Sequence, residues 1–200
     1  MTLRLLNTLA VTLFCFLFYS IKAQEQLNYK ADVKGPVVNV FDSPDLDVAG
    51  ARKTYKAKQW VEFEAGAVFK ARDTSLEAIS EVVAIWYIAI YNKKTKTYSL
   101  LEEAITHVNV PIGEPVYFSS YLSPASLKAL LGKVDERSVK AVGLELEIDG
   151  AIIAVESFKE KQGWWKSESL KTDAAVKLLN KNQTPFRFYW YDRYAELEAK

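Results

Sequence analysis

The chain has 200 residues, of which 50% are hydrophobic and 13% aromatic, and its 26 Lys and Arg nearly balance 25 Asp and Glu. This balance excludes nucleic acid as the expected partner, because neutralising phosphates needs a clear basic excess. The single cysteine, Cys15, excludes a disulfide framework. The composition predicts one domain with a single hydrophobic core.

Residues 1–23 have the pattern of a removable signal peptide. Arg4 supplies the basic region, and an apolar run follows from Leu5 to Phe18. A membrane-spanning helix needs about 20 apolar residues, so this run is short for one. An uncleaved anchor stays open as the alternative. We expect cleavage after Ala23, so that the mature protein begins at Gln24.

Cleavage there changes the character of the chain. It removes Cys15 together with two basic residues, Arg4 and Lys22, which turns the formal net charge from +1 into −1. The mature protein then has no thiol for a disulfide, a nucleophile or a metal ligand. Because small exported eukaryotic domains often use disulfides, the sequence indicates the periplasm or the cell surface of a Gram-negative-type bacterium.

The first half of the mature chain is predicted to form a leader followed by strands. Residues 24–35 are polar and aperiodic, which predicts a flexible leader, and a single domain is expected over 36–200. Residues 36–41 predict a first strand. Residues 60–65 alternate, with both glutamates facing away from the apolar side, which is typical of a half-buried strand. Residues 82–91 are apolar on both faces, as in a central strand.

The middle of the chain carries the sharpest local signals. Strands are predicted over 105–110 and 115–122, and a two-turn helix over 123–132, with Ser123 as N-cap and Pro124 at the first helical position. Asp149-Gly150 predicts a two-residue hairpin. Counting outward from that turn pairs Ile148 with Ala151, Leu146 with Ile153 and Leu144 with Val155, and places Glu145 and Glu147 on the opposite face.

The C-terminal part is harder to interpret. A short capped helix is possible over 172–179, and the structure of 158–183 stays open. Residues 186–191 alternate like a final strand, with Phe186, Phe188 and Trp190 toward the core. Together these elements predict a mainly all-β fold, an antiparallel immunoglobulin-like β-sandwich with one or two short helices.

Candidate catalytic residues are few. His107 is the sole histidine, and no nucleophile elbow accompanies it, so we expect a structural or partly exposed histidine. Its replacement by alanine should cost no more than an ordinary strand substitution. The acidic run 42–47 lacks the glycine and terminal glutamate of a calcium loop. Phosphate loops, metal-spaced histidines and dinucleotide fingerprints are not seen. The sequence therefore predicts no enzyme, no cofactor and no metal.

Aromatic residues gather in the last 40 residues and give the candidate contact surface. Rigid amphipathic rings serve both protein interfaces and sugar platforms. Core packing is expected for Phe186, Phe188 and Trp190. The expected contact residues are Trp164, Trp165, Tyr189 and Tyr191.

Two segments carry a family resemblance. One runs from Ile105 to Val110 (ITHVNV) and continues through Gly113 to Tyr117, Tyr121 and Ser123-Pro124. The other comprises Asn182 to Phe186 (NQTPF) and Trp190 to Tyr194 (WYDRY). Together they resemble small exported proteins encoded beside type IV pilus-like assembly genes in some mucin-associated bacteria. The resemblance spans the chain from about Trp60 onward.

The resemblance implies an immunoglobulin-like sandwich in or beside a pilus-like envelope complex, with no catalytic residues to carry over. A pilin keeps its apolar helix for filament assembly, whereas the apolar run here ends before the expected cleavage site. The first hypothesis is therefore a non-enzymatic accessory protein that contacts envelope or pilus-complex proteins, with a homo-oligomer left open. The alternative is a secreted carbohydrate-binding module.

Overall fold

The computed structural model describes residues 28–44, 56–92, 96–131, 138–172 and 176–199. The expected signal peptide, its boundary at Ala23 and Gln24, and residues 45–47 of the acidic run lie outside these ranges. Among the described helices, none combines the length and the apolar character needed to cross a membrane.

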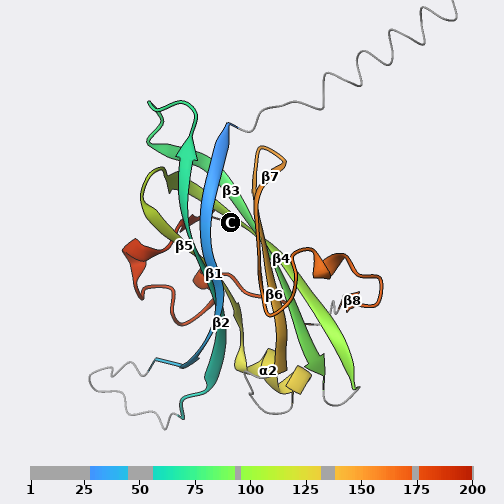
Figure 1. The fold of residues 1–200 in the computed structure, drawn as a ribbon. Coiled ribbons are helices and arrows are strands. Elements are labelled where there is room, and N and C mark those ends of the chain that lie inside the picture. The colour runs from blue at the N-terminus through green and yellow to red at the C-terminus, as the bar shows by residue number, and fades with distance from the viewer. Residues whose placement is uncertain (1–27, 45–55, 93–95, 132–137, 173–175, 200) are drawn as a thin grey trace, which may run out of the picture.

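The chain folds into two sheets (Figure 1). Sheet A contains β1 (Tyr29–Asp42), β2 (Gln59–Ala71) and β5 (Pro115–Leu122) in the order β1-β2-β5. Sheet B has the order β7-β6-β3-β4-β8, and a further strand, β9, also pairs with β4. Its strands are β3 (Ala78–Asn92), β4 (Thr97–Pro111), β6 (Val139–Ile148), β7 (Ala151–Phe158), β8 (Lys171–Thr172) and β9 (Glu196–Leu197).

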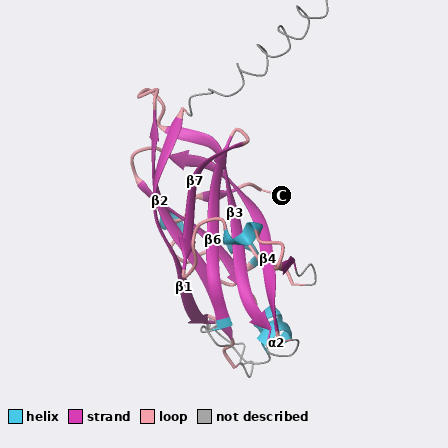
Figure 2. Cartoon of the chain, turned by 45° about the vertical axis from the view of Figure 1, so that its right-hand side comes forward, coloured by secondary structure: helices cyan, strands magenta, loops and turns pink. Residues whose placement is uncertain are grey.

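The core lies between the two sheets, which confirms the prediction of a mainly antiparallel β-sandwich. Figure 2 shows β7, β6, β3 and β4 side by side in sheet B. Alternate residues of β2 and β3, such as Phe63 and Trp86, are fully buried in the core. Helix α2 (Pro124–Leu131) lies at one end of the sandwich and buries Leu127 and Leu130.

The predicted helix signals are confirmed at the start of α2. The Ser123 hydroxyl accepts a hydrogen bond from the Ser126 backbone N–H at 3.1 Å, as an N-cap does. Pro124 is the first residue of the helix. Gly132, the expected closing glycine, lies outside the described residues.

Two strand predictions differ from the structure in extent or register. β1 begins at Tyr29 and pairs with β2 from there, so residues 29–35, expected in the flexible leader, belong to the sandwich. In the hairpin, Ile148 pairs with Ala151 as predicted, but a bulge on β7 shifts the register by one residue. Leu144 consequently pairs with Glu156, because a bulge inserts one unpaired residue into a strand.

The predicted strand over 186–191 is wrong. This segment forms consecutive turns with local hydrogen bonds, including Tyr189 N–H to the Phe186 carbonyl at 2.9 Å. Phe186 is buried, but Phe188 and Trp190, expected in the core, are 69% and 51% exposed. The possible helix over 172–179 is also not found in its described residues, 172 and 176–179. Thr172 ends strand β8, and Leu179 exchanges two backbone hydrogen bonds with Tyr121, each at 2.9 Å.

Candidate functional site

The C-terminal segment, residues 179–197, crosses the outer face of sheet A beside β5. It is joined to β5 at two places, by Leu179 opposite Tyr121 and by Tyr194 opposite Tyr117. The Ala195 N–H also donates to the Tyr117 carbonyl at 3.0 Å. In Figure 1 this orange-to-red segment lies on the side of β5 away from sheet B. It therefore covers side chains that a free sheet face would expose.

Glu62 is a deeply buried charged residue on the covered face, with 1% of its surface exposed. The Tyr121 hydroxyl donates to its Oε1 at 2.5 Å, and the Asn39 amide donates to its Oε2 at 3.0 Å. The Tyr194 hydroxyl also lies 3.1 Å from Glu62 Oε1. A buried carboxyl group needs such partners, because burying it without hydrogen bonds is costly.

Glu64 lies two residues along β2 and on the same face. Its Oε1 accepts a 2.8 Å hydrogen bond and ion pair from Arg193, and its Oε2 lies 2.5 Å from the Tyr194 hydroxyl. Because one hydroxyl has one proton, Tyr194 can donate to Glu62 or to Glu64 but not to both at once. The Arg193 guanidinium also stacks 3.6 Å from the centre of the Tyr117 ring. We call Glu62, Glu64, Tyr121, Arg193 and Tyr194 the carboxylate network.

The environment of the network shifts the pKa values of its other members. Desolvation, with the neighbouring Glu62, raises the pKa of Tyr121 well above its usual value, and desolvation with the Glu64 hydrogen bond does the same for Tyr194. The hydrogen bond to Glu64 raises the pKa of Arg193. Burial lowers the pKa of Lys181, whose Nζ donates to the Tyr189 carbonyl and lies 4.2 Å from the Tyr194 ring centre. Both phenols therefore remain hydrogen-bond donors at neutral pH.

This network was missed at the sequence level. The alternation of 60–65 predicted that Glu62 and Glu64 face away from the core, which is correct, but the outer face is covered by a segment about 130 residues further along the chain. A possible signal was the tyrosine- and arginine-containing segment 191–194, which supplies the hydroxyl and guanidinium donors that buried carboxyl groups require.

Four consecutive aromatic residues, 188–191, project from the C-terminal segment, and we call them the aromatic turn. Phe188 and Tyr191 are each 69% exposed, Trp190 is 51% exposed and Tyr189 is 37% exposed. Phe186 anchors the turn by stacking on Tyr121, with ring centres 5.9 Å apart. The turn thus presents large apolar rings from a fixed base.

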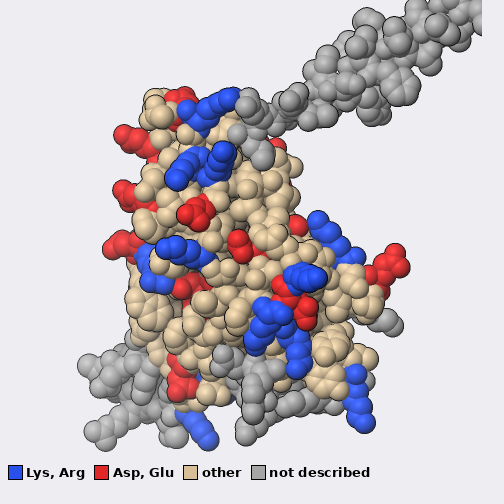
Figure 3. Space-filling model, viewed as in Figure 1, with Lys and Arg blue, Asp and Glu red and all other residues tan. Residues whose placement is uncertain are grey.

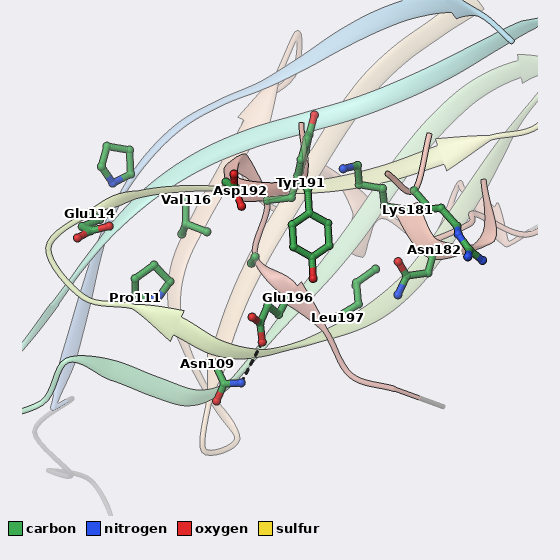
Figure 4. Close-up of a pocket in the computed structure, with 14 residues that line it drawn as sticks. Asn109, Pro111, Glu114, Val116, Lys181, Asn182, Tyr191, Asp192, Glu196 and Leu197 are labelled. Carbon is green, nitrogen blue, oxygen red and sulfur yellow. Dashed lines mark hydrogen bonds between the residues drawn. The ribbon is translucent and has the colours of Figure 1, made fainter. Parts of the chain in front are cut away.

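A cleft of about 520 Å³ lies on one side of the aromatic turn, and we call it the C-terminal cleft (Figure 4). It is bounded by the end of β4, the start of β5 and parts of the C-terminal segment. Figure 4 shows the Tyr191 ring in the middle of the cleft. A smaller pocket of about 200 Å³ lies against the carboxylate network, with Phe41 and Trp190 among its lining residues.

The predicted contact residues divide between two faces of the molecule. Tyr189 and Tyr191 lie in the aromatic turn on sheet A. Trp165 is 6% exposed and packs on the outer face of sheet B, where its ring stacks on Tyr87 at 4.8 Å and 7°. Trp164 is half-buried beside it. The four residues therefore form no common platform, and the expectation that Trp165 is an exposed contact residue is wrong.

Trp165 is buried because β6 leaves room for it. Gly143 has no side chain, and the Trp165 ring occupies the position where a Cβ would stand. The indole N–H donates to Glu145 Oε1 at 3.3 Å, and the Tyr87 hydroxyl donates to Oε2 at 3.1 Å. Glu145, predicted on the face away from the core, is consequently buried at 6% exposure. The short 3₁₀ turn Trp164–Lys166 thus covers part of sheet B.

His107 lies in the core, with 2% of its surface exposed. Its Nδ1 is 3.0 Å from the Ile105 carbonyl oxygen, and its ring meets the edge of Phe118 at 4.8 Å. Burial lowers the pKa of His107 to about 4. These contacts describe a packed side chain, and removing it should cost more than the ordinary strand substitution expected from the sequence.

We expect acid to destabilise the protein through His107. The folded state keeps the imidazole neutral down to about pH 4, whereas the unfolded state binds a proton below about pH 6.5, so stability is present above pH 6.5 and is lost as the pH falls. A pKa difference of this size corresponds to about 3 kcal/mol. Urea unfolding at pH 7 and pH 4.5 measures the loss, and a His107→Gln variant should show a weaker dependence. An equal loss of unfolding free energy between pH 7 and pH 4.5 in the wild type and in His107→Gln would show that His107 is not the group responsible.

Charge is mixed over the face shown in Figure 3, where basic and acidic side chains alternate without a large area of one sign. Among the described residues, no group of three or more His, Cys, Asp or Glu side chains is placed to hold a metal ion.

The fold and this site define a class of protein: a β-sandwich that presents an aromatic turn on the outer face of one sheet, with a polar cleft beside it where the edges of the two sheets meet. A protein-family model matches residues 22–200, so the chain belongs to that family. No curated protein matches the sequence. Among solved structures, the chain is similar to the crystal structure of a protein from Akkermansia muciniphila, with 30% identity and a TM-score of 0.81. The match covers 88% of this chain and 97% of that chain.

Proposed function

We propose that the protein is a non-enzymatic, exported accessory protein of a type IV pilus-like envelope complex, and that it acts through protein–protein contacts. The observation that carries the proposal is the aromatic turn. Four neighbouring aromatic residues, three of them at least half exposed, stand on a base fixed by Phe186 and by the carboxylate network. Aromatic anchors of this kind dominate the binding energy of protein interfaces.

The sequence supports the cellular setting of the proposal. The N-terminal pattern directs export, and the residues of 105–124 and 182–194 resemble those of proteins encoded beside pilus-like assembly genes. The related protein from Akkermansia muciniphila agrees with one part of that resemblance, its occurrence in mucin-associated bacteria. The partner is then expected to be an envelope or pilus-complex protein.

The geometry also supports a binding role over a catalytic one. The only histidine is packed between the sheets. The buried glutamates of sheet A are engaged by Tyr121, Arg193 and Tyr194, which hold the C-terminal segment in place. Because these glutamates are already hydrogen-bonded, their role in the proposal is to hold the aromatic turn in position.

The double substitution Phe188→Ser and Trp190→Ser is expected to remove the partner from a purification of the tagged protein in its native organism. The two rings carry most of the exposed apolar surface of the turn that lies outside the C-terminal cleft. Mass spectrometry of co-purified exported proteins provides the measurement. Leu76→Ser is the matched control, because Leu76 is a 40% exposed apolar residue in the turn between β2 and β3.

Envelope proteins that are recovered with wild type and with Leu76→Ser, but not with the double variant, would support the proposal. Recovery of the same proteins with the double variant would contradict it. The melting temperature of each variant shows whether the fold is retained, since exposed side chains outside the core contribute little to stability.

A further inference from the structure

The C-terminal cleft has the volume of a ligand site. Its volume of about 520 Å³ falls within the range of about 300–1,000 Å³ that is usual for small-molecule pockets. Three separate parts of the chain meet there: β4 at Asn109, β5 at Pro115, and the C-terminal segment at Asn182 and Tyr191. A cleft assembled from distant segments exists only in the folded protein.

The lining favours a ligand that both donates and accepts hydrogen bonds. Two amides, Asn109 and Asn182, lie at the cleft, and the charged residues that line it are of both signs. They are Glu114, Asp192 and Glu196 on the acidic side, and Lys181 and Arg187 on the basic side. A phosphate or another strongly charged ligand would meet repulsion as well as attraction here, and an apolar ligand would leave polar groups unpaired.

Polar groups are available for such a ligand. The Asn109 amide N–H donates to Glu196 Oε2 at 3.0 Å, which fixes both side chains at the cleft (Figure 4). Within the described residues, the amide oxygen of Asn109, Oε1 of Glu196 and the side chain of Asn182 have no hydrogen-bond partner. Fixed groups with open hydrogen-bonding capacity reduce the entropy cost of binding.

The backbone holds these residues in place. β9 pairs with β4, placing Glu196 opposite Val108 and Leu197 opposite His107. Asn109, the next residue of β4, has φ 52°, a left-handed conformation that turns its side chain away from the regular strand alternation. The two sides of the cleft are thus joined by main-chain pairing as well as by the side-chain bond.

Tyr191 supplies an aromatic face inside this polar setting. Its side chain is 69% exposed, and in Figure 4 the hydroxyl points toward the side formed by Glu196 and Leu197. A pyranose ring has an apolar C–H face that packs on an aromatic ring and a rim of hydroxyl groups that need amide and carboxylate partners. The cleft offers both kinds of contact.

We propose that the C-terminal cleft binds a neutral oligosaccharide, with Tyr191 as the stacking platform and Asn109, Asn182 and Glu196 as hydrogen-bonding groups. This site differs from the sequence-based platform, because Trp164 and Trp165 pack on the outer face of sheet B and do not line the cleft. It shares Tyr191 with the aromatic turn, but it can be tested apart from the proposed protein contact, since Phe188 and Trp190 do not line the cleft.

Saturation-transfer NMR on the purified mature protein tests the proposal. The probes are lactose, N-acetyllactosamine, chitotriose and maltotriose, with sialyllactose as the charged comparison. At least one neutral probe should give transfer to its ring protons. Titration should show an affinity loss of about tenfold or more for Tyr191→Ala and a smaller loss for Asn109→Ala, whereas Tyr191→Phe should retain binding.

Phe188→Ala is the matched control, because Phe188 is as exposed as Tyr191, belongs to the same turn and lies outside the cleft. Its affinity for the probe should equal that of the wild type. Three outcomes would overturn the proposal: no transfer to any neutral probe, transfer that survives Tyr191→Ala, or a cleft that instead binds a peptide of a co-purified protein. Loss of the protein partner in Phe188→Ser with Trp190→Ser leaves this result unaffected, so the two proposals fail separately.

Discussion

Glu62→Ala is expected to lower the free energy of unfolding by about 3–5 kcal/mol, the usual cost of breaking a buried charged network by removing one member. The substitution leaves Tyr121 and Asn39 without the acceptors that they use in the folded protein. Tyr194 then has only Glu64 to bond with. Urea unfolding monitored by circular dichroism measures the loss.

Two control variants show whether the stability loss in Glu62→Ala comes from the carboxylate network or from replacing any strand glutamate. Glu81→Ala changes an exposed glutamate of β3 and should stay within about 0.5 kcal/mol of the wild type. Glu62→Gln keeps an acceptor and the shape of the side chain, so it should cost less than Glu62→Ala. A loss below about 1 kcal/mol in Glu62→Ala would show that the C-terminal segment is not held through this residue.

The network also explains how stability and the proposed function are connected. Arg193 and Tyr194 lie two and three residues beyond the aromatic turn. Arg193 bonds to Glu64, and the Tyr194 hydroxyl lies within hydrogen-bond distance of both Glu62 and Glu64. Glu62→Ala should therefore make the C-terminal segment accessible to limited proteolysis before the core of the sandwich unfolds. Local release is expected where few core contacts hold a segment.

Elements whose signals are local could be predicted from the sequence. The strand over 60–65 and the central strand over 82–91 were correct, because alternation and continuous apolar runs report directly on burial. Helix α2 was placed by a serine cap and a proline. The Asp149-Gly150 hairpin was also correct at its turn, where both residues have the positive φ that this turn type requires.

Features that depend on distant contacts could not be predicted. Nothing in 60–65 indicates that Glu62 is covered, since its partner Tyr194 is 132 residues away. In 186–191 the alternation of residue types suggested a strand, but local turns satisfy the backbone, and Trp190 has a positive φ of 51°. The bulge on β7 has no residue signature of its own, and it displaced the predicted register by one position.

The candidate site was predicted only in part for the same reason. The aromatic excess correctly pointed to the C-terminal segment as an exposed surface, and Tyr189 and Tyr191 lie there. Phe188 and Trp190 were assigned to the core because the strand was assumed. Trp165 was expected at the surface because the sequence does not show that Gly143, 22 positions earlier in the chain, leaves space for its ring. That space forms only when β6 and the 3₁₀ turn pack together.

Gly143→Ala is expected to destabilise the protein by about 3 kcal/mol, close to the effect of Trp165→Ala, because truncating a buried aromatic side chain costs about 3–5 kcal/mol. A Cβ at position 143 would stand 2.5 Å from two atoms of the Trp165 ring, closer than carbon atoms approach. The ring must leave, and it then loses its stacking on Tyr87 and its bond to Glu145. Urea unfolding of each variant gives the two losses.

A double-mutant cycle decides whether both substitutions act through the same contact. If Gly143 matters only because its missing side chain leaves space for the Trp165 ring, Gly143→Ala should cost almost no stability in a Trp165→Ala background. The losses of unfolding free energy caused by the two substitutions should then be strongly non-additive. Additive losses would mean that the added methyl group disturbs β6 independently of Trp165. Because the Trp165 ring packs on the outer face of sheet B, away from both the aromatic turn and the lining of the C-terminal cleft, neither variant should alter partner recovery or oligosaccharide binding. This result would also distinguish a structural tryptophan from the contact residue that the sequence suggested.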